Sequence, residues 1–326
     1  MKLTLLGKQE NAHEDGVWSA AWAPSSADAP GGVVVTGSVD ETVKLWQVGD
    51  SGLQPDRTNA GHSLGVVSVA VDPSGTLAAS SSLDSIVRVF EVSTNEQKAA
   101  LESPPAETWG VAFSPSGKQL AVAGGGSGTV KLWSMETFQQ EGNLEIPLPA
   151  EAGSKRSQGR FVLAVAYNMD GRRIAASTMD GTIAIFDVAT LKFMHTLDGH
   201  HMPVRSLAWS PTEPRILYTA SDDCHSHIYD AEGKGLIAAL SGHGSWVLSV
   251  SVSPDGTALV TGSSDRTVRL WDLSLRSCAQ VMSDHGDQVW GVAFRPTAPG
   301  EEPSQRGGSR LVTVSDDRSI ALYDFS

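Results

Sequence analysis

The amino-acid sequence predicts an all-β fold: a single seven-bladed β-propeller whose last blade is closed by the N-terminal strand. The first observation is the stretch from Gly242 to Asp272, GHGSWVLSVSVSPDGTALVTGSSDRTVRLWD. Its alternating apolar residues, β-branched side chains and Pro/Gly punctuation predict three strands, at 246–252, 258–262 and 267–271. The second observation is that this pattern recurs along the chain at near-constant spacing, which indicates one propeller blade per repeat.

Seven repeats follow from the aromatic residue that closes the third strand of each. These aromatic residues are Trp46, Phe90, Trp133, Phe186, Tyr229, Trp271 and Tyr323. Two of the six steps between them are longer, because Pro/Gly/Ser/Glu-rich insertions, expected to be loops, occur at 144–159 and 296–308. The repeats are predicted at about 10–60, 61–103, 104–146, 158–198, 199–241, 242–283 and 284–326, within one domain covering 1–326.

The ends of the chain predict how the ring closes. Each blade needs four strands, but the last repeat stops at Ser326, directly after its third strand. Residues 2–8 are otherwise unassigned, and we expect them to form the outer strand of the last blade. That pairing would join the termini and remove an open sheet edge.

A structural network is predicted around the closing aromatic residues. A His precedes the first strand in five repeats, and a Ser or Thr and an Asp usually lie eight and six residues before the aromatic. We expect the hydroxyl to accept the buried indole N–H and to donate to the His, whose other nitrogen donates to the Asp. Two repeats carry all four members, namely His13, Ser38, Asp40 and Trp46, and His243, Ser263, Asp265 and Trp271. Because the spacing recurs from blade to blade, a scaffold role explains these residues better than catalysis, and no catalytic residue is predicted.

Aromatic residues gather where the predicted first strands enter the central channel. Aligning the repeats places Trp18, Val67, Trp109, Leu163, Arg205, Leu248 and Trp290 at one equivalent position. Phe161 and Trp246 lie two residues earlier in their repeats, where Glu107 also falls. Packing between blades would explain any single Trp, but clustered Trp and Arg are typical of interface hot spots. The predicted partner-binding residues of this top face are Trp18, Trp109, Phe161, Arg205, Trp246 and Trp290.

Composition excludes several classes of function. The net charge is −13, with no basic stripe, so direct stacking of RNA or other nucleic acid on the aromatic residues is disfavoured. Two cysteines, Cys224 and Cys278, indicate a reducing compartment, and neither a signal-peptide pattern nor a membrane-length apolar run is present. An enzyme would need titratable groups at the channel mouth, where only Glu107 and Arg205 are charged. We therefore expect no enzyme activity, no cofactor and no membrane partner.

Three weaker patterns have simpler explanations. The run Cys224-His225-Ser226-His227 resembles a metal site, but it falls where the other repeats have a turn and their third strand, so no metal is predicted. The glycine-rich run 124–128 leads into a strand rather than a helix, which favours a tight turn over a phosphate loop. Lys155, Arg156 and Arg160 form a small basic spot that is either a solvated loop or a contact for an acidic partner.

The repeat, with Gly-His at its front and Trp-Asp at its back, resembles the WD repeat. Longer runs go further: VVTGSVDETVKLW (34–46), TLDGHHMPVRSLAWSP (196–211), LSGHGSWVLSVSVSPDGT (240–257) and DHGDQVWGVAF (284–294) resemble the WD-repeat subunit of the superkiller complex. In animals and plants that subunit also resembles, or is, a subunit of the polymerase-associated factor complex. The resemblance covers essentially the whole chain.

This resemblance implies a non-enzymatic scaffold in the nucleus and cytoplasm. The implied partners are the tetratricopeptide-repeat scaffold protein and the helicase of the superkiller complex, which supports exosome-mediated 3′-to-5′ mRNA decay. The subunits of the polymerase-associated factor complex, which acts in transcription elongation, are also implied. The family docks short partner segments, with Gln-Arg and an aromatic residue, on the top face. The alternative is a WD-repeat adaptor of another assembly, either ciliary or a ubiquitin ligase.

Overall fold

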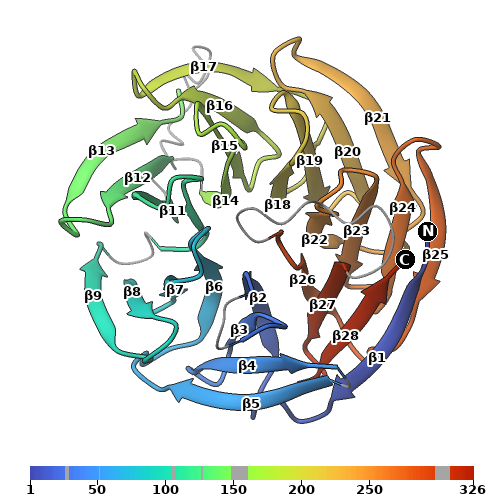
Figure 1. The fold of residues 1–326 in the computed structure, drawn as a ribbon. Helices are drawn as coiled ribbons and strands as arrows, with labels where there is room; N and C mark the ends of the chain where they lie inside the picture. Colours follow the sequence, from blue (N-terminus) through green and yellow to red (C-terminus); the bar gives the residue numbers. More distant parts are fainter. Residues whose placement is uncertain (26–28, 51, 105–107, 126–127, 148–160, 298–308) are drawn as a thin grey trace.

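A computed structural model describes residues 1–326 apart from 26–28, 51, 105–107, 126–127, 148–160 and 298–308. The described residues form 28 strands joined by turns, and no helix. The strands make seven four-stranded antiparallel sheets that surround a central axis (Figure 1). The seven-bladed β-propeller predicted from the repeats is therefore confirmed.

Six blades consist of four consecutive strands each. Blade 1 contains β2 (Val17–Ala23), β3 (Val33–Ser38), β4 (Val43–Gly49) and β5 (Gly52–Asn59). Blade 2 contains β6 (Val66–Val71), β7 (Leu77–Ser82), β8 (Ile86–Glu91) and β9 (Gln97–Glu102). Blade 3 contains β10 (Val111–Phe113), β11 (Gln119–Gly124), β12 (Thr129–Ser134) and β13 (Gln140–Glu145).

The remaining blades follow the same order from the axis outward. Blade 4 contains β14 (Val162–Tyr167), β15 (Arg173–Thr178), β16 (Ile183–Asp187) and β17 (Lys192–Leu197). Blade 5 contains β18 (Val204–Trp209), β19 (Ile216–Ser221), β20 (His225–Asp230) and β21 (Gly235–Ser241). Blade 6 contains β22 (Val247–Val252), β23 (Ala258–Ser263), β24 (Val268–Asp272) and β25 (Ser277–Met282). Blade 7 contains β26 (Val289–Phe294), β27 (Ser309–Ser315), β28 (Ile320–Phe325) and, as its outer strand, β1 (Leu3–Gln9).

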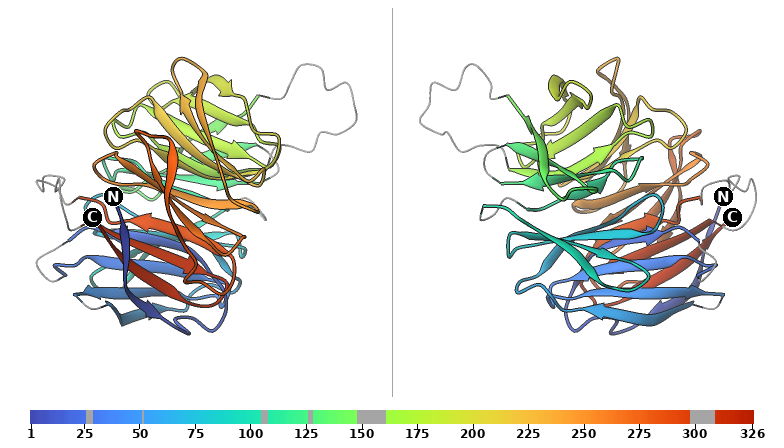
Figure 2. Two further views of the ribbon diagram at one scale, coloured as in Figure 1. Left: turned by 90° about the vertical axis from the view of Figure 1, so that its right-hand side faces the viewer. Right: turned by 60° about the vertical axis from the view of Figure 1, so that its left-hand side comes forward.

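The two ends of the chain close the ring together. The N-terminal strand β1 pairs antiparallel with β28, and the termini lie side by side (Figure 2). The backbone N–H of Lys2 donates to the Ser326 carbonyl, and the Ser326 N–H donates back to the Lys2 carbonyl. Leu3 on this strand is almost fully buried in a core that includes Tyr323 and Phe325. The predicted closure of the last blade by the N-terminal strand is confirmed.

The apolar core lies between neighbouring blades, so each blade depends on the next. Val130 and Leu132 of β12, for example, pack in one cluster with residues of blade 4 such as Val165 and Phe186. In blade 3 the second strand, β11, is buried on both faces, which explains why it reads as an apolar run. The third strand, β12, alternates buried and half-buried residues, and the outer strand, β13, is largely exposed.

A recurrent turn geometry joins the second strand to the third in five blades. The residue after the recurrent Asp takes a left-handed conformation, with φ between 65° and 72° at Glu41, Ser85, Cys224, Arg266 and Arg318. The Asp side chain stabilises this turn: in blade 6 its Oδ1 accepts the N–H of Thr267 at 2.9 Å. Cys224 occupies this turn position in blade 5, which accounts for its place in the Cys-His-Ser-His run.

The hydrogen-bonded network around the closing Trp contains a different hydroxyl from the predicted one. In blade 1 the indole N–H of Trp46 donates to Thr36 Oγ1 at 2.9 Å, and Thr36 lies 2.8 Å from His13 Nε2. His13 Nδ1 lies 3.0 Å from Asp40 Oδ2. The prediction that Ser38 accepts the indole N–H is wrong, because Ser38 instead donates to the Gly16 carbonyl and accepts the Asp40 N–H at the turn.

Blade 6 has the same arrangement, and there too the predicted serine is not the hydroxyl that accepts the indole N–H. The indole N–H of Trp271 donates to Thr261 Oγ1 at 2.9 Å, His243 Nε2 lies 2.7 Å from that oxygen, and His243 Nδ1 lies 2.9 Å from Asp265. The predicted acceptor Ser263 instead bonds backbone groups of Ser245 and Asp265. A strand pleat explains the difference: the indole reaches the residue ten positions earlier, which lies diagonally across the β23–β24 ladder.

The charges in these networks follow from burial. Burial lowers the pKa of the His13 imidazole, and the nearby Asp40 carboxylate only partly offsets this, so the ring is neutral at pH 7. Burial opposes ionisation of Asp265, but hydrogen bonds from His243, Thr267 and the Gly244 N–H outweigh it and hold its pKa far below the ordinary range. A neutral His that donates through Nδ1 to a carboxylate can accept the Thr hydroxyl at Nε2. Every polar member of the network then has a partner.

Candidate functional site

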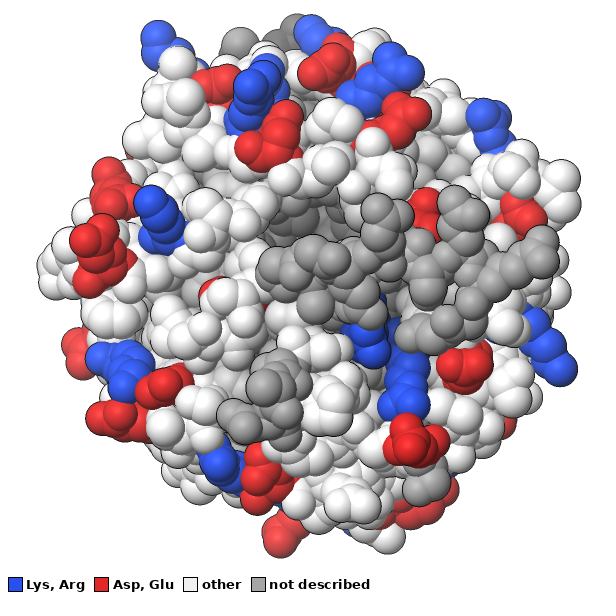
Figure 3. Space-filling view, in the orientation of Figure 1, with Lys and Arg blue, Asp and Glu red and all other residues white. Residues whose placement is uncertain are grey.

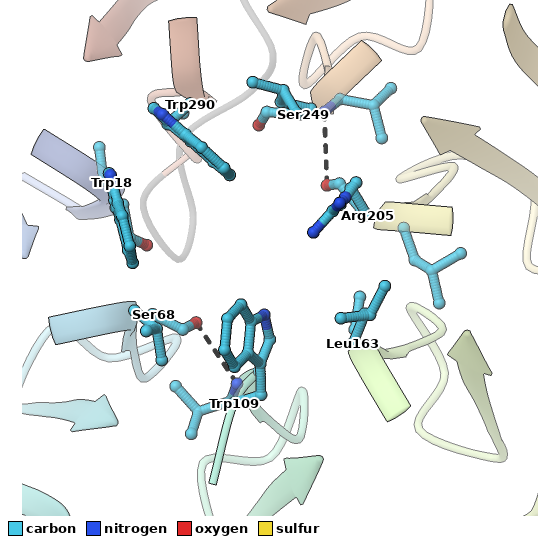
Figure 4. A pocket seen from close by; sticks show the side chains of 18 of the residues that line it. Trp18, Ser68, Trp109, Leu163, Arg205, Ser249 and Trp290 are labelled. Carbon is cyan, nitrogen blue, oxygen red and sulfur yellow. Dashed lines mark hydrogen bonds between the residues drawn. The ribbon is translucent and has the colours of Figure 1, made fainter. Parts of the chain in front are cut away.

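A cavity of about 240 Å³ lies on the propeller axis, where the first strands of all seven blades begin. Figure 4 shows Trp18, Trp109, Trp290 and Arg205 pointing toward one another across this cavity, with Leu163 beside them. Together with Val67 and Leu248 they supply one residue from each blade, at the position that the repeat alignment made equivalent. The propeller thus brings residues from seven distant segments into one ring, which we call the axial rim.

Serine side chains tie the strands together one step below the axial rim. The hydroxyls of Ser19, Ser68, Ser206 and Ser249 each accept a backbone N–H from the next blade. Figure 4 shows the bond at Ser68. These bonds fix neighbouring first strands in register, so the axial rim rests on a rigid base.

Trp18 and Trp290 form a pair on one side of the axial rim. Their ring centroids are 5.3 Å apart, and both indole N–H groups donate to the carboxylate of Asp316, at 3.0 Å and 2.7 Å. Burial raises the pKa of Asp316, the Asp287 and Asp15 carboxylates raise it further, and the two indole bonds oppose them. One half-buried carboxylate therefore holds both indoles by their N–H edges and leaves ring surface facing the cavity.

Two further contacts involve aromatic residues from neighbouring blades. Trp109 and Phe161 meet edge to face with centroids 5.6 Å apart. Arg205 forms a forked ion pair with Asp222, through Nε–Oδ1 at 2.9 Å and Nη2–Oδ2 at 2.7 Å. Its guanidinium carbon also lies 5.9 Å from the ring centroid of Trp246, which is 44% exposed. A cation held over an exposed indole presents a flat surface that a partner side chain can cover.

The structure therefore brings all six predicted partner-binding residues to one end of the propeller. Four of them line the cavity, while Phe161 and Trp246 contact the axial rim from outside it. Glu107, the other predicted charged group here, lies outside the described residues. Sequence reasoning missed Asp222 and Asp316, although both lie seven residues before the closing aromatic and could have been found at that position.

Comparison with known proteins decides the family. The profile described as "IFT122 first beta-propeller" matches residues 34–324, and the profile described as "WD domain, G-beta repeat" matches residues 5–47. The chain belongs to the WD-repeat β-propeller family. WD-repeat propellers are typically non-enzymatic scaffolds that bind other proteins, so the coarse function of this chain is that of an interaction scaffold.

Individual WD-repeat proteins resemble the chain to different extents. It is 55% identical to the WD repeat-containing protein VIP3 of Arabidopsis thaliana, over the full length of both chains. It is 36% identical to the WD repeat-containing protein SL1-17 of Schistosoma mansoni, over 97% of each chain. Striatin-3 of Mus musculus is 24% identical over 88% of this chain but only 38% of its own length.

Exposed apolar side chains lie near the axial rim in blades 2, 4, 5 and 6 of this WD-repeat propeller. They lie in turns that start or end at the same end of the blades, and they are Leu64, Leu83, Met179, Met202 and Trp246. Leu83 and Met179 occupy, in their own blades, the position of Asp222 and Asp316. Exposed apolar side chains beside a rigid group of aromatic residues are typical of a protein-binding face.

The weaker sequence patterns contribute nothing to this site in the described residues. Across the described part of the chain, no group of three His, Cys, Asp or Glu side chains could hold a metal ion. His227 instead stacks on His200 with centroids 3.8 Å apart, and burial lowers its pKa to about 4. Gly126 and Ser127 of the glycine-rich run, and the basic residues Lys155, Arg156 and Arg160, lie outside the described residues.

Charge on the visible face of the WD-repeat propeller is mixed. In Figure 3, Lys and Arg side chains are scattered among Asp and Glu around the perimeter, without a continuous basic stripe on that face. Within the described residues there is no helix long and apolar enough to cross a membrane. Both cysteines, Cys224 and Cys278, are free thiols.

Proposed function

We propose that this WD-repeat propeller is a scaffold subunit of the superkiller type, present in the nucleus and cytoplasm. In this role it binds a tetratricopeptide-repeat scaffold protein and helps to position a helicase that delivers mRNA to the exosome for 3′-to-5′ decay. We propose that it also joins the polymerase-associated factor complex in transcription elongation. The full-length similarity to VIP3 and the match of the repeats along the whole chain support this assignment.

The axial rim is the proposed docking site, and the Trp18–Trp290 pair on Asp316 is the observation that carries it. Two indoles held by one carboxylate lose little side-chain freedom when a ligand covers them, so binding costs little conformational entropy. Trp and Arg are also the residues that most often dominate binding energy at protein interfaces. A short partner segment that places an aromatic or aliphatic side chain over the cavity would bury the exposed ring surface.

Capture of partners from native lysate tests this function. We expect the wild-type chain to retain a helicase and a tetratricopeptide-repeat protein, identified by mass spectrometry, and the Trp18→Ala/Trp290→Ala variant to lose them. Truncation of a Trp that dominates an interface typically reduces the binding free energy by about 2 kcal/mol or more. Two such losses are enough to abolish detectable capture of a partner that binds with micromolar affinity. Leu275→Ala is the matched control, because Leu275 is 73% exposed in a turn at the opposite end of blade 6.

The outcomes separate the function from the site. If the double variant loses the partners while its circular dichroism spectrum stays native, the result supports both the superkiller assignment and the axial rim as the docking site. Equal capture by the wild-type chain and the folded variant would retain the function and reject the axial rim. Capture of ciliary or ubiquitin-ligase components instead would reject the superkiller assignment and favour the alternative adaptor role.

A further inference from the structure

A second cavity lies away from the axial rim, between blades 4 and 5. Its volume is about 450 Å³, within the range of about 300–1,000 Å³ that ligand pockets usually have. It opens where β17 and β21 lie next to each other on the perimeter (Figure 1). Its lining comes from the end of β18, the start of β17 and the turn before β21, which all lie at the end of the blades opposite the axial rim. We call it the perimeter groove.

Hydrogen bonds between the two blades hold the perimeter groove open. The buried Trp209 donates its indole N–H from blade 5 to the Ala166 carbonyl of blade 4 at 3.1 Å. His195 Nε2 lies 2.6 Å from the Ala231 carbonyl, and Asn168 Nδ2 donates to the Pro214 carbonyl at 3.2 Å. The groove is therefore preformed, and a ligand need not separate the blades.

The bulge position of the outer strands is apolar beside the perimeter groove and in blades 6 and 7, whereas it is charged in blades 1, 2 and 3. Each outer strand has one bulged residue opposite the closing aromatic, and in blades 1, 2 and 3 this residue is Asp56, Lys98 and Glu141. In blades 4 and 5 it is Met194 and Ile237, which are 41% and 36% exposed. Charged residues on outer strands normally protect a propeller's edges from other chains, so their replacement here exposes apolar surface beside a cavity.

The lip of the perimeter groove is basic in a chain of net charge −13. Arg173, Arg215 and Lys234 line it against a single lining carboxylate, Glu232. Arg173 is held by Asp187 at 2.5 Å, whereas Arg215 is 55% exposed and makes two looser ion pairs, with Glu213 at 3.5 Å and with Asp230 at 4.0 Å. Exposed pairs of this kind contribute little, so a ligand carboxylate can replace them. Arg215 and Lys234 are therefore the cations that a ligand would meet.

We propose that the perimeter groove binds an acidic linear segment of a partner protein. One large apolar side chain of that segment would enter the cavity against Met194 and Trp209, and flanking carboxylates would pair with Arg215 and Lys234. Charge complementarity argues for this occupant, because the lip is basic while the floor is apolar. The site goes beyond the superkiller assignment and does not depend on it.

Methionine-methyl NMR of the isolated chain tests this proposal. The probe is the acetylated peptide Glu-Asp-Leu-Trp-Glu-Asp, and its control is Lys-Arg-Leu-Trp-Lys-Arg. We expect the acidic peptide to shift the Met194 methyl resonance saturably, because that side chain lines the perimeter groove. The resonances of Met179 and Met202, which lie at the axial-rim end, should stay in place.

Charge reversal makes the test specific. The double substitution Arg215→Glu/Lys234→Glu should lower the affinity of the acidic peptide by at least about tenfold, because two charge-assisted contacts become repulsive. Lys118→Glu, at another exposed position, should leave binding unchanged. A Met194 resonance that stays in place at millimolar acidic peptide, or responds equally to the basic peptide, would overturn the proposal. So would a shift confined to Met179 and Met202, which would place acidic segments on the axial rim instead.

Discussion

The Thr261→Val substitution is expected to lower the free energy of unfolding by about 2–4 kcal/mol. Thr261 is fully buried, and its hydroxyl joins the Trp271 indole N–H to His243 Nε2. Valine has nearly the same shape and fills the same space, so the packing survives. The indole N–H and the imidazole nitrogen, however, both stay buried without a partner, and each such group costs about 1–3 kcal/mol.

Ser263→Ala is the matched comparison, because Ser263 lies two residues further along β23 and is equally buried. Its hydroxyl bonds only backbone groups at the turn, so its loss should cost about 1 kcal/mol. Urea-induced unfolding of both variants, followed by circular dichroism, gives the two values. A cost for Ser263→Ala equal to or larger than that for Thr261→Val would contradict the network described here.

The Leu3→Ala substitution should also destabilise strongly, by about 2–5 kcal/mol. Leu3 is 2% exposed and packs with Tyr323, Phe325 and Met282, so truncation leaves a cavity at the point where the ring closes. Its backbone is also engaged, since Gln280 of β25 bonds both its N–H and its carbonyl at 2.9 Å. Loss of Leu3 packing therefore weakens the contact of the N-terminal strand with both blade 7 and blade 6.

Leu5→Ala on the same strand provides the control. Leu5 is 42% exposed, so its truncation should change stability by no more than about 0.5 kcal/mol. Thermal unfolding of the two variants, with hydrogen exchange of β1 and β28 measured in parallel, checks the comparison. Equal effects of the two truncations would mean that closure by β1 contributes little to the stability of the propeller.

The fold could be predicted from the sequence because seven repeats with the same pattern support one another's strand and turn assignments. One repeat alone would leave strands and turns ambiguous. The turn that contains the Asp, however, recurs with the same spacing in most repeats, and this regularity indicates a ring of equivalent blades. The last repeat supplies only three strands of its own, and the N-terminal strand β1 pairs with β28 as the fourth, as predicted. The wrong hydroxyl in the network shows the limit of this reasoning. Spacing identified Ser38 and Ser263 as candidates, but the diagonal reach of an indole across a β-ladder depends on the pleat.

A further signal for the correct hydroxyl was present in the sequence. Ten residues before the closing aromatic, the five blades that have a His carry Thr or Ser, whereas the two blades without it carry Ala123 and Ala176. The hydroxyl therefore occurs only where a His can bond it. Consistent with this, the indole N–H of Trp133 in blade 3 is buried and has no hydrogen-bond partner among the residues that the structure describes.

The candidate site was predictable in position but not in chemistry. Alignment of the repeats placed Trp18, Trp290 and Arg205 at one level because first strands share their starting point. The partners Asp316 and Asp222 come from other turns, and whether they reach an indole or a guanidinium depends on the distance across strands and blades. The perimeter groove was missed for the same reason, since its lining residues from blades 4 and 5 form no pattern along the chain.

Hydroxyl-radical footprinting tests most directly whether the axial rim is the docking surface. Oxidation of Trp18, Trp109, Trp246 and Trp290 would be measured by mass spectrometry, in the isolated chain and in the complex purified with its native partners. We predict that these four indoles are protected in the complex, while Leu275 at the opposite end is oxidised to the same extent in both samples. Equal oxidation of the four indoles in the free and the assembled chain would contradict the assignment of the axial rim as the docking surface.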